Sequence, residues 1–301
     1  MKLSVIVPVY NERENIPPFY ERTRKVLEAI PALESWQIVF VNDGSQDNSL
    51  ERILKIRAQD PRVKVVTLSR NFGYHAVLVA GLTLTESDLY AIIDVDGEDP
   101  PELFTSFYQA IQAHAQVVYG IRSQRDEPRW ITSFRALFYH INNRIADSPT
   151  VLWMAEFGMI TKEVRNAILA PRTTYPFLRA ELAYVGFRRV GIPYQRSKRM
   201  HGESHYRFGS MTRFAVAAFL ASSTFPLRMV LYLAAGFGLA LPIVTWLRKL
   251  SMGQAAAAAG LFMYYFLLLT VPMIALYLAR TYKNGVARPV FIVDEGQTHL
   301  S

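Results

Sequence analysis

The sequence predicts an α/β fold with a mainly parallel sheet, followed by two helices that span a membrane. Three observations lead to this expectation. Short β-branched runs alternate with helical patterns as far as Gly120, polar clusters follow three of these runs, and two long uncharged stretches lie in the last third of the chain. Alternation of this kind is typical of a layered fold in which helices cover the faces of a parallel sheet.

Each predicted strand is a short run rich in Val, Ile or Leu, and turn-forming residues such as Pro, Gly, Asn or Asp bound it. Helical patterns lie between these runs, and the one at 76–84 is rich in small residues. The pattern is less regular over residues 126–206, where no further element is assigned. In chain order, the expected elements are a strand at 3–9, a helix at 14–29, a strand at 37–41, a helix at 48–59, a strand at 63–68, a helix at 76–84, a strand at 89–93, a helix at 102–114 and a strand at 116–120.

Polar clusters lie at the carboxyl ends of the first, second and fourth predicted strands. In an open α/β sheet this edge is where ligands bind, in the crevice where the strand order reverses. The sequence therefore places three groups of side chains on one rim. These are Tyr10-Asn11-Glu12, Asp43, and the acids Asp94, Asp96 and Glu98.

The acidic cluster follows the fourth strand directly and precedes two prolines. Asp94 and Asp96 are two residues apart, so they face the same side of an extended chain, and Glu98 continues the row if the backbone stays extended. Carboxylates this close repel one another unless a cation lies among them. Oxygen ligands of this kind suit Mg²⁺ or Mn²⁺ bridging the phosphates of a ligand. Asp99, just before Pro100, is expected to shape the turn or to cap the next helix.

The other two polar clusters each admit a structural and a functional interpretation. Pro8-Val9-Tyr10-Asn11-Glu12 is either a strand-to-helix turn with Asn11 as N-cap, or a site where Tyr10 lies against a base and Asn11 or Glu12 near a ribose. Asn42-Asp43-Gly44-Ser45 is either an Asx turn, or a site where Asp43 accepts a hydrogen bond from a base or ribose. The residues alone leave both alternatives open.

The overall composition limits the partners. The chain of 301 residues has a net charge of +8 and no cysteine, which excludes disulfides and thiolate metal sites. The positive charge favours anionic partners such as phosphates, nucleotides and acidic lipid. No basic run with interleaved aromatic residues occurs, so no nucleic-acid partner is expected. The chain enters its first strand after Met1-Lys2, so no signal peptide is expected and the domain should stay in the cytoplasm.

Two uncharged stretches, residues 229–247 and 255–279, are long enough to cross a bilayer, which takes about 20 apolar residues. The short link between them predicts a hairpin whose flanks share one side. The predicted organisation is an α/β domain at 1–206, an amphipathic segment at 207–228, the hairpin at 229–279 and a tail at 280–301. A short strand returning to the domain is expected at 288–293. Basic residues favour cytoplasmic flanks: Arg207, Arg213, Arg228, Arg280, Lys283 and Arg288 lie outside the hairpin, and Arg248 and Lys249 lie in its loop.

Five motifs occur in order along the chain. They are V-I-V-P-V-Y-N-E, V-N-D-G-S-Q-D-N-S, L-S-R-N-F-G-Y-H-A, D-V-D-G-E-D-P-P-E and R-M-H-G-E-S-H-Y. Together with the hairpin they resemble the polyprenyl-phosphate glycosyltransferases of glycosyltransferase family 2, which include the dolichyl-phosphate mannosyltransferase type and bacterial enzymes that load undecaprenyl phosphate. The resemblance implies a GT-A fold, a nucleotide-sugar donor, with UDP-sugars favoured, and Mg²⁺ or Mn²⁺.

The resemblance also implies roles for individual residues. Asp94, Asp96 and Glu98 would hold the metal, with Asp96 catalytic, and the nucleotide-sugar would contact Pro8, Tyr10, Asn11, Glu12, Asp43 and Asp94. Ser204 lies where the family closes a loop over the acceptor phosphate. Two arginines are chosen by their place in the chain as catalytic contacts to that phosphate, Arg122 just after the fifth strand and Arg199 near Gly202-Glu203-Ser204. Arg135 is a third candidate that does not align with the family pattern, and a solvated surface charge is the alternative for it.

The chain departs from the family pattern at three positions. Glu98 stands where the family usually has Gln, which adds a negative charge and leaves the metal preference open. Glu156 and Gly158 stand where the family more often has Asp and Arg, so sugar recognition is the least secure part of the comparison.

The expected activity is a single inverting transfer of one sugar to undecaprenyl phosphate at the cytoplasmic face of the plasma membrane, for cell-envelope glycans such as lipopolysaccharide. A lipid phosphate is already an anionic nucleophile, so it needs positive charge and alignment rather than a general base. The alternatives are a processive polysaccharide synthase and a non-catalytic membrane-anchored nucleotide-binding protein. Such synthases usually carry Q-x-x-R-W, whereas here Gln124 and Arg129-Trp130 have the wrong spacing. The apolar segment beside two membrane helices also favours a homo-oligomer.

Overall fold

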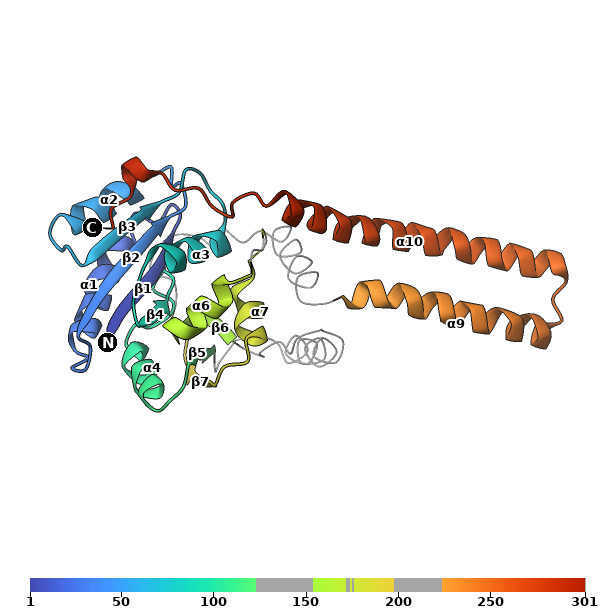
Figure 1. Ribbon diagram of the computed structural model, residues 1–301, viewed down its shortest axis with the longest axis horizontal. Helices are drawn as coiled ribbons and strands as arrows, with labels where there is room; N and C mark the ends of the chain where they lie inside the picture. The colour runs from blue at the N-terminus through green and yellow to red at the C-terminus, as the bar shows by residue number, and fades with distance from the viewer. Residues whose placement is uncertain (123–153, 172–173, 175, 198–223, 301) are drawn as a thin grey trace.

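The computed structural model describes residues 1–122, 154–171, 174, 176–197 and 224–300. Seven strands form one sheet in the order β3-β2-β1-β4-β6-β5-β7 (Figure 1). β6 runs antiparallel to both of its neighbours, and every other pair of strands is parallel. The sheet is therefore mainly parallel, as the sequence predicts. The strands are β1 (Lys2–Val9), β2 (Ser35–Asn42), β3 (Val63–Thr67), β4 (Leu89–Ile92), β5 (Val117–Arg122), β6 (Met154–Thr161) and β7 (Arg189–Tyr194).

All nine elements predicted as far as Gly120 are present, with ends that differ by no more than a few residues. The elements described between residues 122 and 224 were not predicted, because the sequence pattern there is less regular and the two helices in this region last only about two turns each. The helices in the described part of the domain are α1 (Ile16–Glu28), α2 (Ser49–Arg57), α3 (Tyr74–Leu84), α4 (Leu103–Gln112), α6 (Lys162–Leu169) and α7 (Leu178–Tyr184).

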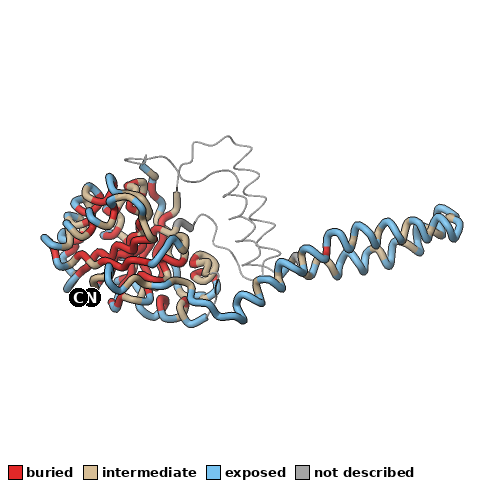
Figure 2. Tube along the Cα trace, turned by 90° about the horizontal axis from the view of Figure 1, so that it is seen from above, coloured by how far each residue is buried: buried red, intermediate tan, exposed pale blue. Residues whose placement is uncertain are grey.

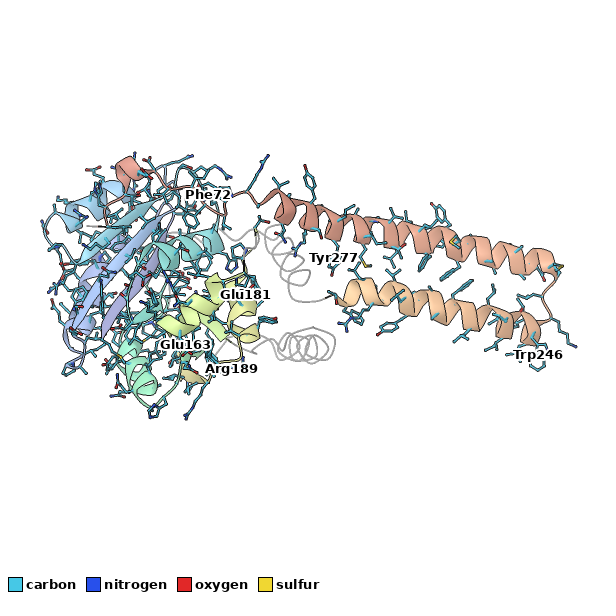
Figure 3. The ribbon with its side chains drawn as sticks, viewed as in Figure 1. Phe72, Glu163, Glu181, Arg189, Trp246 and Tyr277 are labelled. Carbon is cyan, nitrogen blue, oxygen red and sulfur yellow. The ribbon has the colours of Figure 1, made fainter. Side chains whose placement is uncertain are left out.

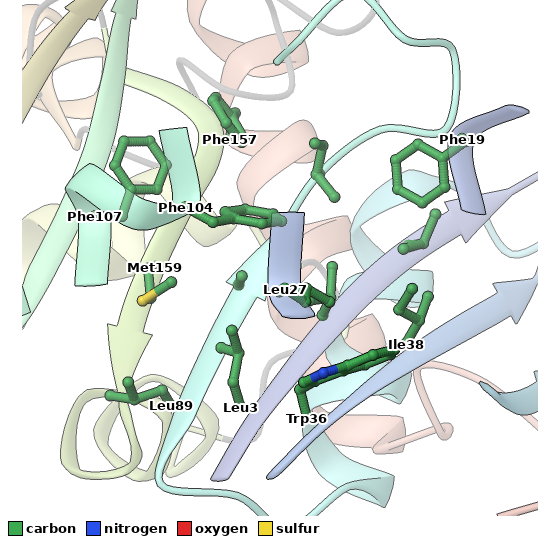
Figure 4. Packing of buried hydrophobic residues seen from close by; sticks show 14 of the residues in the cluster. Leu3, Phe19, Leu27, Trp36, Ile38, Leu89, Phe104, Phe107, Phe157 and Met159 are labelled. Atoms are coloured by element: carbon green, nitrogen blue, oxygen red, sulfur yellow. The ribbon is translucent and has the colours of Figure 1, made fainter. Parts of the chain in front are cut away.

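The sheet is buried on both faces, which is why its central strands read as continuous apolar runs. Along β1, Leu3, Val5 and Val7 pack into one hydrophobic cluster with α1 and α4, and Ile6 packs into a second cluster with α3 and α6. Figure 4 shows the first cluster, and Figure 2 shows buried residues concentrated along the sheet. Each large apolar side chain buried in this way contributes about 1.5–3 kcal/mol to folding.

The strand order reverses between β1 and β4, and this point positions the polar rim. β1 lies between β2 on one side and β4 on the other, with Val9 opposite Asn42 and Ile6 opposite Ile92. Because the three strands are parallel, their carboxyl ends meet at one edge of the sheet. The prediction that the three polar clusters share a rim is confirmed.

A buried arginine connects the second half of the domain to the first. Arg165 on α6 is only 8% exposed, and its guanidinium donates hydrogen bonds to the carbonyl oxygens of Leu82 (2.7 Å), Thr83 (3.1 Å) and Thr85 (3.2 Å). These carbonyls belong to the end of α3, where a helix leaves acceptors unsatisfied. Arg165 therefore completes the C-terminal end of α3 and fixes α6 against it.

Two long helices project from the domain as a hairpin, α9 (Phe225–Arg248) and α10 (Met252–Val286) (Figure 1). Both are long and apolar enough to cross a membrane, judged by length and composition, and their side chains are mostly exposed. Figure 3 shows these side chains projecting from both helices, with Trp246 near the distal end. Both predicted spans are helical and are longer than predicted. The predicted amphipathic segment lies mostly outside the described residues.

The hairpin turns within three residues. Lys249 ends α9 in the left-handed conformation (φ 49°), and Ser251 begins α10 with a capping box that includes Gln254. The two helices also contact each other directly, since the rings of Phe237 and Phe262 stack with centroids 3.5 Å apart. The tight turn and the stacked rings make α9 and α10 one antiparallel unit.

Beyond α10 the chain returns to the domain, as predicted. It reaches β3, where Leu68 bridges to Val293 and Val65 bridges to His299 in antiparallel fashion. The pairing consists of isolated bridges around a short 3₁₀ turn, η1 (Glu295–Gln297), rather than the continuous strand expected at 288–293.

Candidate active site

The acidic segment leaves the sheet earlier than predicted. β4 ends at Ile92, and Gly97 turns the chain with φ at 76°, a conformation that only glycine adopts without strain. Asp96 Oδ1 accepts a hydrogen bond from the Glu98 backbone N–H (3.0 Å), which closes the turn. A continuous row of three acids requires an extended backbone, and the turn at Gly97 breaks it. Asp94 and Asp96 therefore remain as a pair, without Glu98.

Asp94 lies where negative charge is concentrated. Burial raises the pKa of its carboxyl to about 7, and the neighbouring carboxylates of Asp96, Asp99 and Glu156 act in the same direction. The Tyr74 hydroxyl donates a hydrogen bond to Asp94 Oδ1 (2.9 Å), which opposes the shift only in part. Carboxylates grouped in this way repel one another, and a bound cation would offset that repulsion.

Glu98 and Asp99 face two arginines instead. Glu98 forms an ion pair with Arg196, and Asp99, which is buried, accepts a hydrogen bond from the Tyr194 hydroxyl. Guanidinium groups of Arg196 (3.6 Å) and Arg122 (3.9 Å) also lie near the Asp99 carboxylate. The prediction that Asp99 caps the next helix is wrong, because α4 has Glu102 at its N-cap position. Asp99 instead anchors the cations beside the acidic turn.

A divalent metal fits this turn only if protein carboxylates and ligand phosphates coordinate it together. Among the residues that the structure describes, no three His, Cys, Asp or Glu side chains are grouped as ready metal ligands. Asp94 and Asp96 supply two carboxylates, while Glu98 is engaged by Arg196. Mg²⁺ is often bound through one or two carboxylates together with substrate phosphates and water. The donor set suits an ion that arrives with a diphosphate.

The end of β1 forms a tight turn on the same rim. Asn11 has φ at 55°, its side-chain Oδ1 accepts the Gln46 N–H (2.8 Å), and its own N–H donates to Ser45 Oγ (3.1 Å). Asn11 is therefore not the N-cap of α1, a position held by Asn15. The Asn15 side chain donates to Glu12 Oε2 (2.6 Å), while Pro8 and Tyr10 are partly exposed at the rim.

Asp43, at the end of β2, is almost fully buried. Its two carboxylate oxygens accept the backbone N–H groups of Phe72 (2.7 Å) and Gly73 (2.9 Å). Burial raises the pKa of Asp43, although these two bonds favour the ionised form. The Asn42 side chain closes the turn after β2, since its Oδ1 accepts the Ser45 N–H three residues on (3.1 Å). Asp43 therefore joins the end of β2 to the loop after β3.

Arg122 is the one predicted acceptor-phosphate residue that lies within the described part of the chain. It ends β5, and its Nε donates to the Tyr194 hydroxyl (3.2 Å). Its guanidinium interacts electrostatically with Asp94 and Glu98, so it faces the acidic turn. Arg135, Arg199 and Ser204 lie outside the described residues.

Sequence reasoning missed two cations, Arg179 and Arg196, that the second half of the domain brings to the site. Arg179 on α7 forms an ion pair with Glu156 (3.5 Å) on β6, and Arg196 follows β7. Gly158 explains one departure from the family pattern, because a Cβ there would lie 2.5 Å from the Val118 carbonyl oxygen. No side chain fits at 158 on this backbone, and Arg179 brings a guanidinium to Glu156 from another element. Neither arginine occurs in a recognisable sequence pattern.

Comparison with known proteins agrees with this geometry. The model of glycosyl transferase family 2 matches residues 4–163, more than half of the chain. The chain belongs to glycosyl transferase family 2. It is therefore a glycosyltransferase, and its sheet and helices form the GT-A-like fold that the sequence predicts.

Two relatives by sequence and one solved structure illustrate the similarity. A prophage bactoprenol glucosyl transferase homolog of Escherichia coli (strain K12) is 30% identical over 97% of this chain and 98% of its own. An undecaprenyl-phosphate 4-deoxy-4-formamido-L-arabinose transferase of Salmonella choleraesuis is 27% identical over 98% of this chain and 93% of its own. The crystal structure of glucosyl-3-phosphoglycerate synthase from Mycobacterium tuberculosis with Mn²⁺, UDP-glucose and phosphoglyceric acid has a TM-score of 0.52 and 15% identity, covering 73% of this chain and 79% of that one. This last similarity shows the fold alone.

Proposed function

We propose that this glycosyltransferase transfers one sugar from a nucleotide-sugar to a polyprenyl phosphate, in a single inverting displacement at the cytoplasmic face of a membrane. Undecaprenyl phosphate is the proposed acceptor, and UDP-sugars are the first donors to test. The observation that carries the proposal is the pairing, in one chain, of a rim with Asp94, Asp96 and Arg122 and a hairpin with exposed apolar side chains. Relatives named for bactoprenol and undecaprenyl phosphate support the same acceptor.

The donor would lie along the rim formed by β1, β2 and β4. The proposed contacts to its nucleoside are Pro8, Tyr10, Asn11 and Glu12, with Asp43 behind them. Asp94 and Asp96 would hold Mg²⁺ or Mn²⁺ against the diphosphate, and Glu98 would join them only on leaving Arg196. When bound, the metal neutralises charge on the departing nucleoside diphosphate.

The sugar itself is proposed to contact Glu156. Its Oε1 is buried and has no hydrogen-bond partner among the described residues, while the carboxylate is paired with Arg179. A carboxylate oxygen left in this state is suited to accept a hydrogen bond from a sugar hydroxyl. Glu156 is electrostatically coupled to Asp94, which would place the sugar beside the diphosphate.

The acceptor phosphate would be held by cations rather than activated by a base. A phosphate monoester is an anion near neutral pH, so it needs a partner that orients it and offsets its charge. Arg122 stands at the end of β5 facing the acidic turn, where a guanidinium can bind a phosphate through two N–H groups. Arg135, Arg199 and Ser204 are proposed to complete this contact.

One assay tests the reaction. We expect the purified protein, given a panel of UDP-, GDP- and dTDP-sugars with Mg²⁺ or Mn²⁺ and undecaprenyl phosphate, to form a lipid-linked monosaccharide detectable by mass spectrometry. Omitting the lipid should leave the donor intact. Long polymer would indicate a processive synthase, and nucleotide binding without any product would indicate a non-catalytic protein; either outcome contradicts the proposal.

The hairpin is proposed to cross the membrane with its turn on the far side from the domain. Because the chain has no cysteine, single cysteines report accessibility without background. We expect Met252→Cys, at an exposed position beside the hairpin turn, to react with a membrane-impermeant maleimide in intact cells from which the outer membrane has been removed. Lys25→Cys, on the exposed face of α1, should react only after lysis. Equal labelling of both before lysis, or of neither, would contradict this topology.

A further inference from the structure

The segment after the hairpin, residues 291–300, docks on the outer edge of the sheet. It is called the C-terminal strap below. Backbone hydrogen bonds join Val65 and His299 in both directions (2.9 and 2.7 Å), and the Asp294 N–H donates to the Thr67 carbonyl (2.8 Å). Phe291 and Leu300 pack against the second hydrophobic cluster. The strap therefore pairs with an edge strand whose N–H and C=O groups would otherwise be unpaired.

Thr298 is the side chain that fastens the strap. Its hydroxyl accepts the Thr67 backbone N–H (3.0 Å) and donates to the Asp294 carbonyl (2.8 Å). Thr67 returns the contact, because its own hydroxyl donates to the Gln297 carbonyl (3.0 Å). One hydroxyl thus connects β3 to both ends of the turn within the strap.

The strap continues past β3 to the loop at residues 69–73. The Ser69 N–H donates to the Ile292 carbonyl (2.9 Å), at the point where this loop begins. The loop ends at Phe72 and Gly73, whose N–H groups are held by the Asp43 carboxylate. A Cβ on Gly44 would lie 2.7 Å from the Arg70 carbonyl carbon, so the loop also packs directly on the turn after β2. The strap and Asp43 therefore hold opposite ends of one loop.

The strap is also close to the membrane hairpin in the chain. Only three residues lie between Ala287, the C-cap of α10, and Phe291, and such a link spans at most about 14 Å. The side-chain oxygen of Asn284 accepts hydrogen bonds from the N–H (3.1 Å) and hydroxyl (2.5 Å) of Thr174, which fixes the end of α10 against the domain. The position of the strap is thus linked to that of the hairpin.

We propose that the C-terminal strap is a positioning element for the donor site, acting through the loop at 69–73 and Asp43. Resting on the proposed function, this assigns the strap to nucleotide binding rather than to acceptor binding. Hydrogen bonds join the strap to the start of the loop and Asp43 to its end, and residues 288–290 connect the strap covalently to the hairpin. If the strap only covered the edge of the sheet, its release from β3 would leave the loop at 69–73 as ordered as before.

The test compares Thr298→Val with Thr298→Ser in the full-length protein. Valine has nearly the same shape and loses both hydrogen bonds of the hydroxyl, whereas serine keeps the hydroxyl. We expect Thr298→Val to speed amide hydrogen exchange about tenfold at Val293 to His299 and also at Ser69, Phe72 and Gly73. Thr298→Ser should exchange at the wild-type rate at all of these positions, as should the β1 amides in both variants.

The kinetic readout separates donor from acceptor. With the donor and undecaprenyl phosphate that give product in the wild type, Thr298→Val should raise the donor KM about three- to tenfold and leave the acceptor KM unchanged. Faster exchange in the strap with unchanged exchange at 69–73, or an unchanged donor KM, overturns the proposal. If no donor is turned over, the proposed function has failed, while exchange at 69–73 in the ligand-free protein still decides whether the strap orders the loop.

Discussion

Asp96→Asn is expected to lower kcat about a thousandfold while leaving the fold intact. Asn keeps the oxygen that accepts the Glu98 N–H and closes the turn, so the backbone has no reason to move. The change removes one of the two carboxylates beside the site proposed for the metal and diphosphate. Loss of charge stabilisation on a leaving diphosphate is worth several kcal/mol, and a thousandfold corresponds to about 4 kcal/mol. Steady-state kinetics at saturating donor and thermal unfolding measure the two effects separately.

The matched control is Asp88→Asn. Asp88 also accepts a backbone hydrogen bond, from the Lys2 N–H (2.7 Å), but it precedes β4 and lies at the opposite edge of the sheet from the rim. Its replacement should leave kcat within a factor of two. An Asp96→Asn protein that retains more than a tenth of the wild-type kcat would exclude Asp96 from the metal site.

Glu98→Gln tests whether the activity depends on the total negative charge of this turn or on the carboxylate at position 96 in particular. It removes the same charge two residues away and restores the residue usual in the family. Because Glu98 is paired with Arg196 and is not grouped with Asp94, the variant should lose far less activity than Asp96→Asn. A comparable loss would indicate that Glu98 leaves Arg196 and joins the metal ligands in the working enzyme.

The sequence was sufficient for the half of the domain whose structure depends on local patterns. Alternating strands and helices with β-branched runs predicted the sheet, and polar residues at strand ends predicted the rim. Both follow from burial of both sheet faces, which makes the strands mostly apolar and gathers the acids and amides of the rim just beyond the strand ends. The same logic gave the hairpin, because long uncharged stretches are rare in any other setting.

The sequence was insufficient wherever a residue's role depends on a distant partner. Asp99 looked like a helix cap because Pro100 follows it, yet its surroundings come from Tyr194 and Arg196, about a hundred residues later. Arg165 carries no motif, although it completes α3. Glu98 was placed in a row of acids on the assumption of an extended backbone, and Gly97 breaks that assumption. These contacts are set by tertiary packing, which periodicity does not report.

Arg122→Ala is expected to reduce kcat/KM for the lipid acceptor about a hundredfold, with a smaller effect on the donor KM. The physical reason is that a phosphate nucleophile repelled by the acids of the turn approaches only where a cation offsets its charge. Arg122 ends β5, and its guanidinium faces those acids. A hundredfold loss in kcat/KM corresponds to an activation free energy raised by about 2.7 kcal/mol, which is typical for removal of one such partner. Initial rates over a grid of donor and acceptor concentrations separate the two constants.

Arg122→Lys and Arg24→Ala complete the experiment. Lysine keeps the charge but not the guanidinium fork, nor the Nε that donates to Tyr194, so about a tenfold loss is expected if two N–H groups bind the phosphate. Arg24 pairs with Glu21 and Glu28 on the surface of α1, and its removal should leave both constants unchanged. Asp99 keeps Arg196 as a partner in the Arg122 variants, so the fold should persist. If Arg122→Ala instead raises the donor KM and spares the acceptor, Arg122 binds the diphosphate, and the acceptor phosphate must be held by cations from the second half of the chain.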